Sequence, residues 1–122
     1  MTEYNPYDHA EQLGITVIHR ALRASNGLWL PGHNTIVVQS GLRAVHDRST
    51  LAHELGHAAY GHRGDSQKHE NQANKFAANN LIRLDQCVDV MRAAPDEHGA
   101  ALELGVTTRL LRVFLDLHPL AG

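Results

Sequence analysis

The stretch that decides the fold of this chain reads Leu51-Ala52-His53-Glu54-Leu55-Gly56-His57-Ala58-Ala59-Tyr60-Gly61-His62. Its leucines and alanines recur at the spacing of one helix side, which favours an amphipathic helix that buries that side in a core. We expect this helix to run from about Arg48 to Tyr60, with Asp47 as its N-cap and Gly61 as its stop. His53 and His57 are four residues apart, so both side chains leave the helix from a single face.

Two histidines on one helix face can bind a single metal ion, for which zinc is the natural candidate. Glu54 follows the first histidine directly, so its carboxylate lies beside the ion without being a ligand, where it can accept a proton from a water molecule. The His-Glu-x-x-His pattern is therefore typical of a metallopeptidase. Two solvated surface histidines are the alternative, which the separate apolar side of the helix makes less favourable.

A catalytic zinc ion usually has three protein ligands and one open position. The downstream candidates for the third ligand are His62, Asp65, His69 and Glu70. His62 lies at the tail of the same helix, from which reaching back to the ion is difficult. Glu70 is favoured because it opens a predicted helix that runs from Ser66 or Gln67 toward Leu84, and its face continues with small and apolar residues, Ala73, Ala77 and Leu81. His69 remains the reserve candidate.

Three short apolar segments before the motif predict a small sheet. Ile15-Thr16-Val17-Ile18 is rich in β-branched residues, and two further segments, Leu28–Leu30 and Thr35–Gln39, flank the turn-forming Pro31-Gly32-His33-Asn34. We expect a hairpin within a mainly antiparallel three-stranded sheet that packs on the motif helix, and a short first helix over Tyr7–Leu13. The predicted fold class is α+β.

The chain from Asp85 onward has the pattern of a helical extension. Pro95-Asp96 opens one helix that Gly105 closes, and Thr107 or Thr108 caps the last one. Two helices joined by a glycine turn also suggest a DNA-binding helix-turn-helix. Acidic residues outnumber the basic ones there, which are Arg92, Arg109 and Arg112, so this alternative is disfavoured.

Length and composition limit the remaining possibilities. A chain of 122 residues, 43% of them hydrophobic, fits one domain over 1–122, with the sheet and metal-binding helices in about 1–84 and the extension in about 85–122. The net charge of -2 predicts no general attraction to nucleic acid or to a membrane. Cys87 is the only cysteine, which excludes an internal disulfide and a thiolate-rich zinc site. The first residues, Met1 to Pro6, lack a secretion signal, so we expect a cytoplasmic protein, and a monomer.

Two motifs in order carry a resemblance to a known family. Thr50–Ala58 with Gly61-His62, followed by Glu70-Asn71-Gln72-Ala73-Asn74-Lys75-Phe76-Ala77-Ala78-Asn79-Asn80-Leu81-Ile82, resembles the ImmA/IrrE family of metallopeptidases. The hairpin and the segment Leu102–Val106 with its following helix also resemble the family's layout, so the likeness covers most of the chain. It implies a zincin-like minimal metallopeptidase whose third zinc ligand is Glu70. Many members have an acidic residue where this chain has Gln72.

The resemblance also implies a function. One Zn2+ ion per chain would be held by His53, His57 and Glu70, although Mn2+ or another divalent ion suits the same donors. Glu54 would pass a proton from water to the leaving amine. The expected substrate is a helix-turn-helix transcriptional repressor of a phage, a mobile element or a stress regulon, with no direct contact to nucleic acid or membrane. A non-catalytic repressor-binding antirepressor is the second hypothesis. The transition-state donor stays open among Tyr60, His62 and His69.

Overall fold

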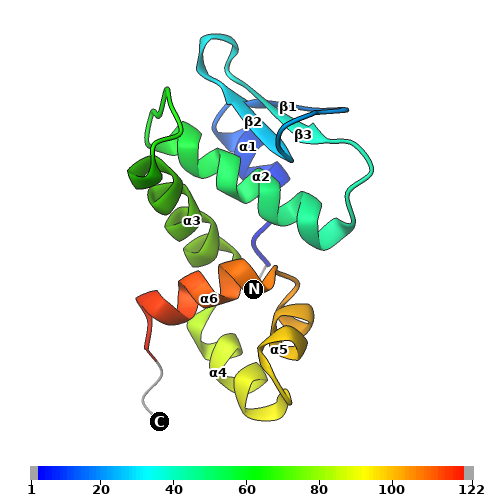
Figure 1. The fold of residues 1–122 in the computed structure, drawn as a ribbon, viewed down its shortest axis with the longest axis vertical. Coiled ribbons are helices and arrows are strands. Elements are labelled where there is room, and N and C mark those ends of the chain that lie inside the picture. The colour runs from blue at the N-terminus through cyan, green and yellow to red at the C-terminus, as the bar shows by residue number, and fades with distance from the viewer. Residues whose placement is uncertain (1–2, 120–122) are drawn as a thin grey trace.

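The computed structural model describes residues 3–119, so Met1 and Thr2, on which the prediction about a secretion signal partly rests, lie outside it. Its elements in chain order are α1 (Pro6–Gln12), β1 (Thr16–Arg20), β2 (Gly27–Leu30), a 3-10 turn (Pro31–His33), β3 (Thr35–Gln39), α2 (Ala44–Ala59), α3 (Gln67–Leu81), α4 (Leu84–Ala93), α5 (Glu97–Leu104) and α6 (Thr108–Leu117). The sheet, α1 and α2 occupy one end of the molecule and α4 and α5 the other (Figure 1). The predicted α+β class is confirmed.

The sheet has three strands in the order β1-β3-β2. The predicted hairpin is present, since β2 pairs antiparallel with β3. The pairing of β1 with β3 is parallel, so the sheet is mixed rather than mainly antiparallel. The reason is the strand order, because β3 lies between β1 and β2, so β1 pairs with β3 and not with β2, the next strand in the chain. Ile36, Val37 and Val38 of β3 are all buried, which suits a central strand, whereas Leu28 in β2 is exposed and suits an edge.

Helix α2 lies between two hydrophobic clusters. Leu51 and Leu55 pack with the sheet residues Ile36 and Val38, while Ala52 belongs to the cluster formed by the later helices. These residues lie on adjacent faces of α2, and the face that carries His53 and His57 is the one left for the cleft described below. Packing on both sides therefore fixes the helix that presents the motif.

The start of α2 differs from the prediction. The helix begins at Ala44 with Arg43 as its N-cap, so Asp47 lies inside the first turn. The Asp47 carboxylate is instead bound by the Tyr7 hydroxyl and by Nε2 of His19, the latter at 2.9 Å. Asp47 therefore ties α2 to α1 and β1. This tertiary role competes with capping and is not visible in the local sequence.

Helix α3 begins as predicted, with Ser66 as its N-cap, but ends at Leu81 rather than Leu84. Ile82 and Arg83 have extended backbone conformations, after which α4 begins. The predicted opening of α5 at Pro95-Asp96 is confirmed, with Asp96 as its N-cap, and of the two candidate caps for α6 the N-cap is Thr107. Within residues 3–119, no helix has both the length and the apolar character needed to cross a membrane.

Gly56 explains how closely α2 and α3 approach each other. A Cβ atom at this position would lie 2.8 Å from Cα and 2.9 Å from the carbonyl oxygen of Ala73. Neither of these backbone atoms can move aside without shifting α3. The absence of a side chain at position 56 therefore lets α3 pack directly against α2.

Candidate metal centre

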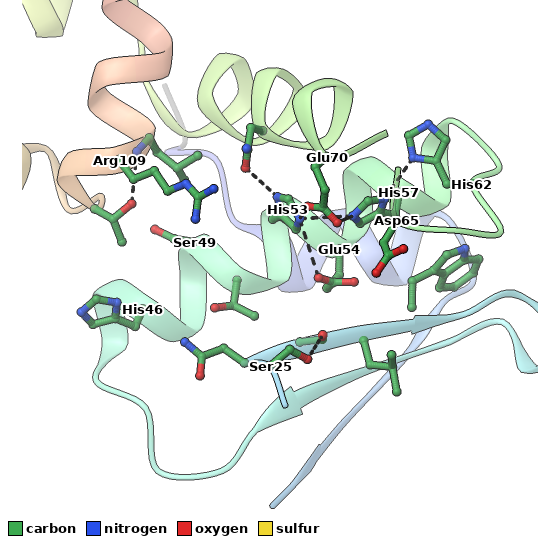
Figure 2. A pocket seen from close by; sticks show the side chains of 18 of the residues that line it. Ser25, His46, Ser49, His53, Glu54, His57, His62, Asp65, Glu70 and Arg109 are labelled. Atoms are coloured by element: carbon green, nitrogen blue, oxygen red, sulfur yellow. Dashed lines mark hydrogen bonds and ion pairs between the residues drawn. The ribbon is translucent and has the colours of Figure 1, made fainter. Parts of the chain in front are cut away.

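The predicted ligands come together from two neighbouring helices. His53 and His57 project from α2, and Glu70 projects from the first turn of α3 into the space beside them (Figure 2). His53 Nε2 lies 2.8 Å from Glu70 Oε2, and His57 Nε2 lies 3.2 Å from Glu70 Oε1. The two Nε2 atoms are 3.2 Å apart. Glu70 thus faces both imidazoles, as the helix-face argument predicts.

These separations match those that one small ion requires. A tetrahedron with metal-to-ligand distances of about 2.0–2.1 Å has edges of about 3.3 Å. One ligand atom from each of His53, His57 and Glu70 lies within 4.8 Å of the others. The donor set of two imidazoles and one carboxylate suits zinc and also several other divalent ions. The residues present therefore fit a metal ion, whose identity the geometry alone leaves open.

The outer ring nitrogens of both histidines also have partners. His53 Nδ1 lies 2.8 Å from Asn74 Oδ1, and His57 Nδ1 lies 3.0 Å from Nδ1 of His62. Such hydrogen bonds orient a ligand ring and leave Nε2 free for the metal. Burial, the largest cause, and the neighbouring His53 lower the pKa of His57, which favours the neutral ring that a metal needs.

Glu54 occupies the position expected of a proton carrier. Its Oε2 lies 4.0 Å from His53 Nε2, and the residue is only 8% exposed. Burial, followed by the charge of Glu70, raises the pKa of Glu54 to about 7, while a backbone hydrogen bond from Trp29 acts in the opposite direction. A carboxyl group that titrates near neutral pH can both accept and return a proton.

Gly27 in β2 makes room for this carboxylate. A Cβ atom at position 27 would lie 2.6 Å from Cγ2 of Thr50, one turn before Glu54 on α2, and 2.9 Å from Cγ and 3.1 Å from Oε2 of Glu54. The strand backbone therefore passes directly beside the Glu54 side chain. This role of Gly27 was not predicted, because nothing near it in the sequence indicates which helix it approaches.

A cleft of about 890 Å³ contains the site. One wall is formed by the segment 25–29, which includes the start of β2, and another by the first turn of α6 with Thr107 and Arg109. The loop residues Arg63 and Asp65 also line it (Figure 2). His53, Glu54, His57 and Glu70 all line the cleft, so the four predicted site residues share one solvent-accessible space.

Of the three candidates for a transition-state donor, only His62 lines the cleft. Tyr60 and His69 are not among the residues that line the cleft within the described chain, and both have their rings stacked on that of His62. Both ring nitrogens of His62 already have partners, His57 and Gln72. None of the three is therefore placed as a free donor to a substrate in the cleft.

The supporting roles of Asn74, His62 and Gln72 were not predicted from the sequence. Two signals in the sequence point to Asn74 and His62, and none points to Gln72. Asn74 follows Glu70 by four residues and so lies on the same face of α3. Gly61 after the last turn of α2 predicts a left-handed cap, which folds the chain back so that His62 contacts the helix end.

The fold and the site together define a class of protein. Two histidines of a His-Glu-x-x-His helix, a glutamate from the next helix and a buried glutamate beside the first histidine are typical of metallopeptidases. A family model described as the IrrE N-terminal-like domain, Peptidase_M78, matches residues 10–115. The match covers most of the chain, which therefore belongs to this peptidase family, and the predicted resemblance to ImmA/IrrE is confirmed. A comparison with curated proteins finds no match.

Proposed function

We propose that this protein is a zinc-dependent endopeptidase that cleaves a helix-turn-helix transcriptional repressor and thereby relieves repression. The observation that carries the proposal is the convergence of His53, His57 and Glu70, with their ligand atoms within 4.8 Å of one another, beside the buried carboxyl group of Glu54. Membership of a peptidase family supports the reaction type. The repressor as substrate rests on the resemblance to ImmA/IrrE proteins.

The chemistry follows from the positions of these residues. An ion held by His53, His57 and Glu70 would supply a Lewis acid that polarises water and the scissile carbonyl group. Glu54 takes the proton from the attacking water and returns it to the nitrogen of the departing amine. The raised pKa of Glu54 suits both steps, since a group that titrates near neutral pH exchanges protons readily in either direction.

The substrate segment would bind in an extended conformation along β2. This strand is at the edge of the sheet, and its residues Gly27, Leu28 and Trp29 line the cleft. An edge strand offers unpaired backbone groups with which an extended peptide can pair. Because Gly27 lies directly beside Glu54, a peptide paired with β2 would pass the catalytic carboxylate. Backbone pairing places few demands on side chains, so selection of the repressor would depend on further contacts outside the cleft.

The test is co-expression with each helix-turn-helix repressor of the source genome, followed by mass spectrometry of the fragments. Wild-type protein should cut the repressor at one or a few positions, and a chelator should prevent it. Glu54→Gln should keep the metal, because residue 54 is not a ligand, and abolish cleavage. An intact repressor in the presence of metal-loaded wild-type protein would refute the proposal. Relief of repression by Glu54→Gln would instead favour the non-catalytic antirepressor.

A DNA-binding role for the last two helices has less support. Leu110, Leu111 and Phe114 of α6 are buried in the core that the later helices form. On the exposed side, Arg112 is paired with Glu97, and Arg109 lines the cleft. Phosphate contacts require basic side chains that are available on the surface. This alternative would gain support only if the protein bound a specific DNA sequence with an affinity that decreases steeply with salt concentration and that Arg109→Ala reduces.

A further inference from the structure

The end of α2 folds back on itself and carries His62 to the outer side of the metal site. Gly61 has a φ angle of 68°, the left-handed conformation that glycine adopts readily. Its N–H donates to the carbonyl of Ala58 at 3.0 Å, and the N–H of His62 donates to the carbonyl of His57 at 2.9 Å. This pair of bonds is a Schellman motif, in which the second residue after the cap usually makes an apolar contact with the last turn. Here that contact is between two imidazole rings.

The hydrogen-bond partners leave one consistent arrangement of protons. His57 Nε2 must be unprotonated to bind an ion, so the proton of the neutral ring resides on Nδ1, from which it is donated to Nδ1 of His62 at 3.0 Å. Since His62 Nδ1 then accepts, its Nε2 carries a proton and donates it to Gln72 Oε1 at 2.7 Å. The amide oxygen of Gln72 can only accept a hydrogen bond, so it fixes the direction of this series of hydrogen bonds from His57 through His62.

The ring of His62 is held firmly in this position. The residue is 6% exposed, and its ring lies 3.9 Å from that of His69 and 5.4 Å from that of Tyr60, with an interplanar angle of 11° in both cases. Gln72 comes from α3, the helix that also supplies Glu70. His62 therefore joins the ligand helix α2 to α3 through polar contacts at a buried point.

We propose that His62 is a positioning residue that acts through His57. It fixes the ring orientation of His57 and its proton on Nδ1, so that Nε2 is presented to the metal, and Gln72 in turn fixes His62. This role rests on the proposed metal site and not on any particular substrate. Outer partners of metal-binding histidines commonly change metal affinity about 10- to 100-fold when they are removed.

Two substitutions of His62 separate positioning from packing. His62→Phe keeps a ring for the stack but removes both nitrogen atoms. His62→Asn loses the ring, while its Oδ1 can still accept the proton of His57 Nδ1. We expect zinc affinity, measured by competition with a chromophoric chelator, to fall about 10- to 100-fold in His62→Phe and less in His62→Asn. His69→Phe, a matched change in the stacked ring that contacts no ligand, should alter the affinity less than about threefold.

A second measurement requires no substrate. Nitrogen-15 NMR of the histidine rings in zinc-loaded wild-type protein at pH 8 should show His62 with its proton on Nε2 only, because its Nδ1 accepts from His57 and its Nε2 donates to Gln72. Gln72→Leu, which removes only the far acceptor, should produce a mixture of the two His62 proton forms even if His62→Phe fails to fold. The proposal would be overturned by wild-type zinc affinity in folded His62→Phe, by an affinity lower in His62→Asn than in His62→Phe, or by a proton on Nδ1 of wild-type His62. Failure to cleave a repressor would count against the proposed function alone.

Discussion

The buried carboxyl group of Glu54 should make the metal-free protein less stable as the pH rises. Its pKa is raised from 4.5 to about 7, chiefly by burial. Between these two values the folded state keeps the proton that the unfolded state has lost, so the folded state binds more protons. The free energy of unfolding must then fall with increasing pH across this window and level off above about pH 7.

The size of the effect follows from the same two values. A shift from 4.5 to about 7 corresponds to about 3 kcal/mol at pH 8, as an upper value. Glu54→Gln stays neutral at every pH and can still accept the backbone hydrogen bond from Trp29. The variant should therefore match the wild type below pH 4.5 and exceed its stability by up to about 3 kcal/mol at pH 8.

Urea unfolding of both proteins at several pH values, with chelator present, measures this difference. The histidines titrate in both proteins, so most of their contribution cancels in the comparison. Glu103→Gln is the matched control, because Glu103 is exposed on α5 and its replacement should change stability by no more than about 0.5 kcal/mol. Equal stability of Glu54→Gln and wild type at pH 8 would refute the conclusion that burial raises the pKa of the Glu54 carboxyl group.

Three further predictions concern the metal and the close backbone contacts. Glu70→Gln should lower zinc affinity more than 100-fold and remove the rise in thermal unfolding temperature that zinc gives the wild type; an unchanged zinc titration would contradict the site. Gly56→Ala should reduce stability by about 1–3 kcal/mol in urea despite the better helix propensity of alanine, because the new Cβ meets the backbone of Ala73, whereas Gly64→Ala, with open space around it, should be nearly neutral. Gly27→Ala should lower kcat of the peptidase at least about 10-fold with little change in zinc affinity, since the methyl group displaces the side chain of Glu54 but touches no ligand.

The parts of this protein that were predictable from its sequence are those governed by helical spacing. His53 and His57 fall on one face at a separation of four residues, and Glu70 shares its face with Ala73, Ala77 and Leu81, all of them buried. Helix periodicity and first-turn position were therefore sufficient to predict that these three candidate ligands lie together. Capping signals such as Ser66, Asp96 and Thr107 also placed the helix starts, since each acts on the backbone a few residues away.

The parts that were not predictable depend on contacts between distant segments. Asp47 has the residue type of an N-cap, but its carboxylate is bound by Tyr7 and His19. The parallel pairing of β1 with β3 follows from the position of β3 between β1 and β2, which no local pattern in the sequence indicates. The approach of Gly27 to Glu54 likewise requires the sheet and α2 to be docked first.

The candidate metal ligands and the residues that orient them all lie between His53 and Asn74, in the hairpin formed by α2 and α3. Two walls of the cleft come from elsewhere, from the segment that leads into β2 and from the start of α6. Under the proposed function, catalysis and target selection would therefore depend on separate stretches of the chain. Changes in the walls would then alter which polypeptide is bound while the candidate ligands stay in place.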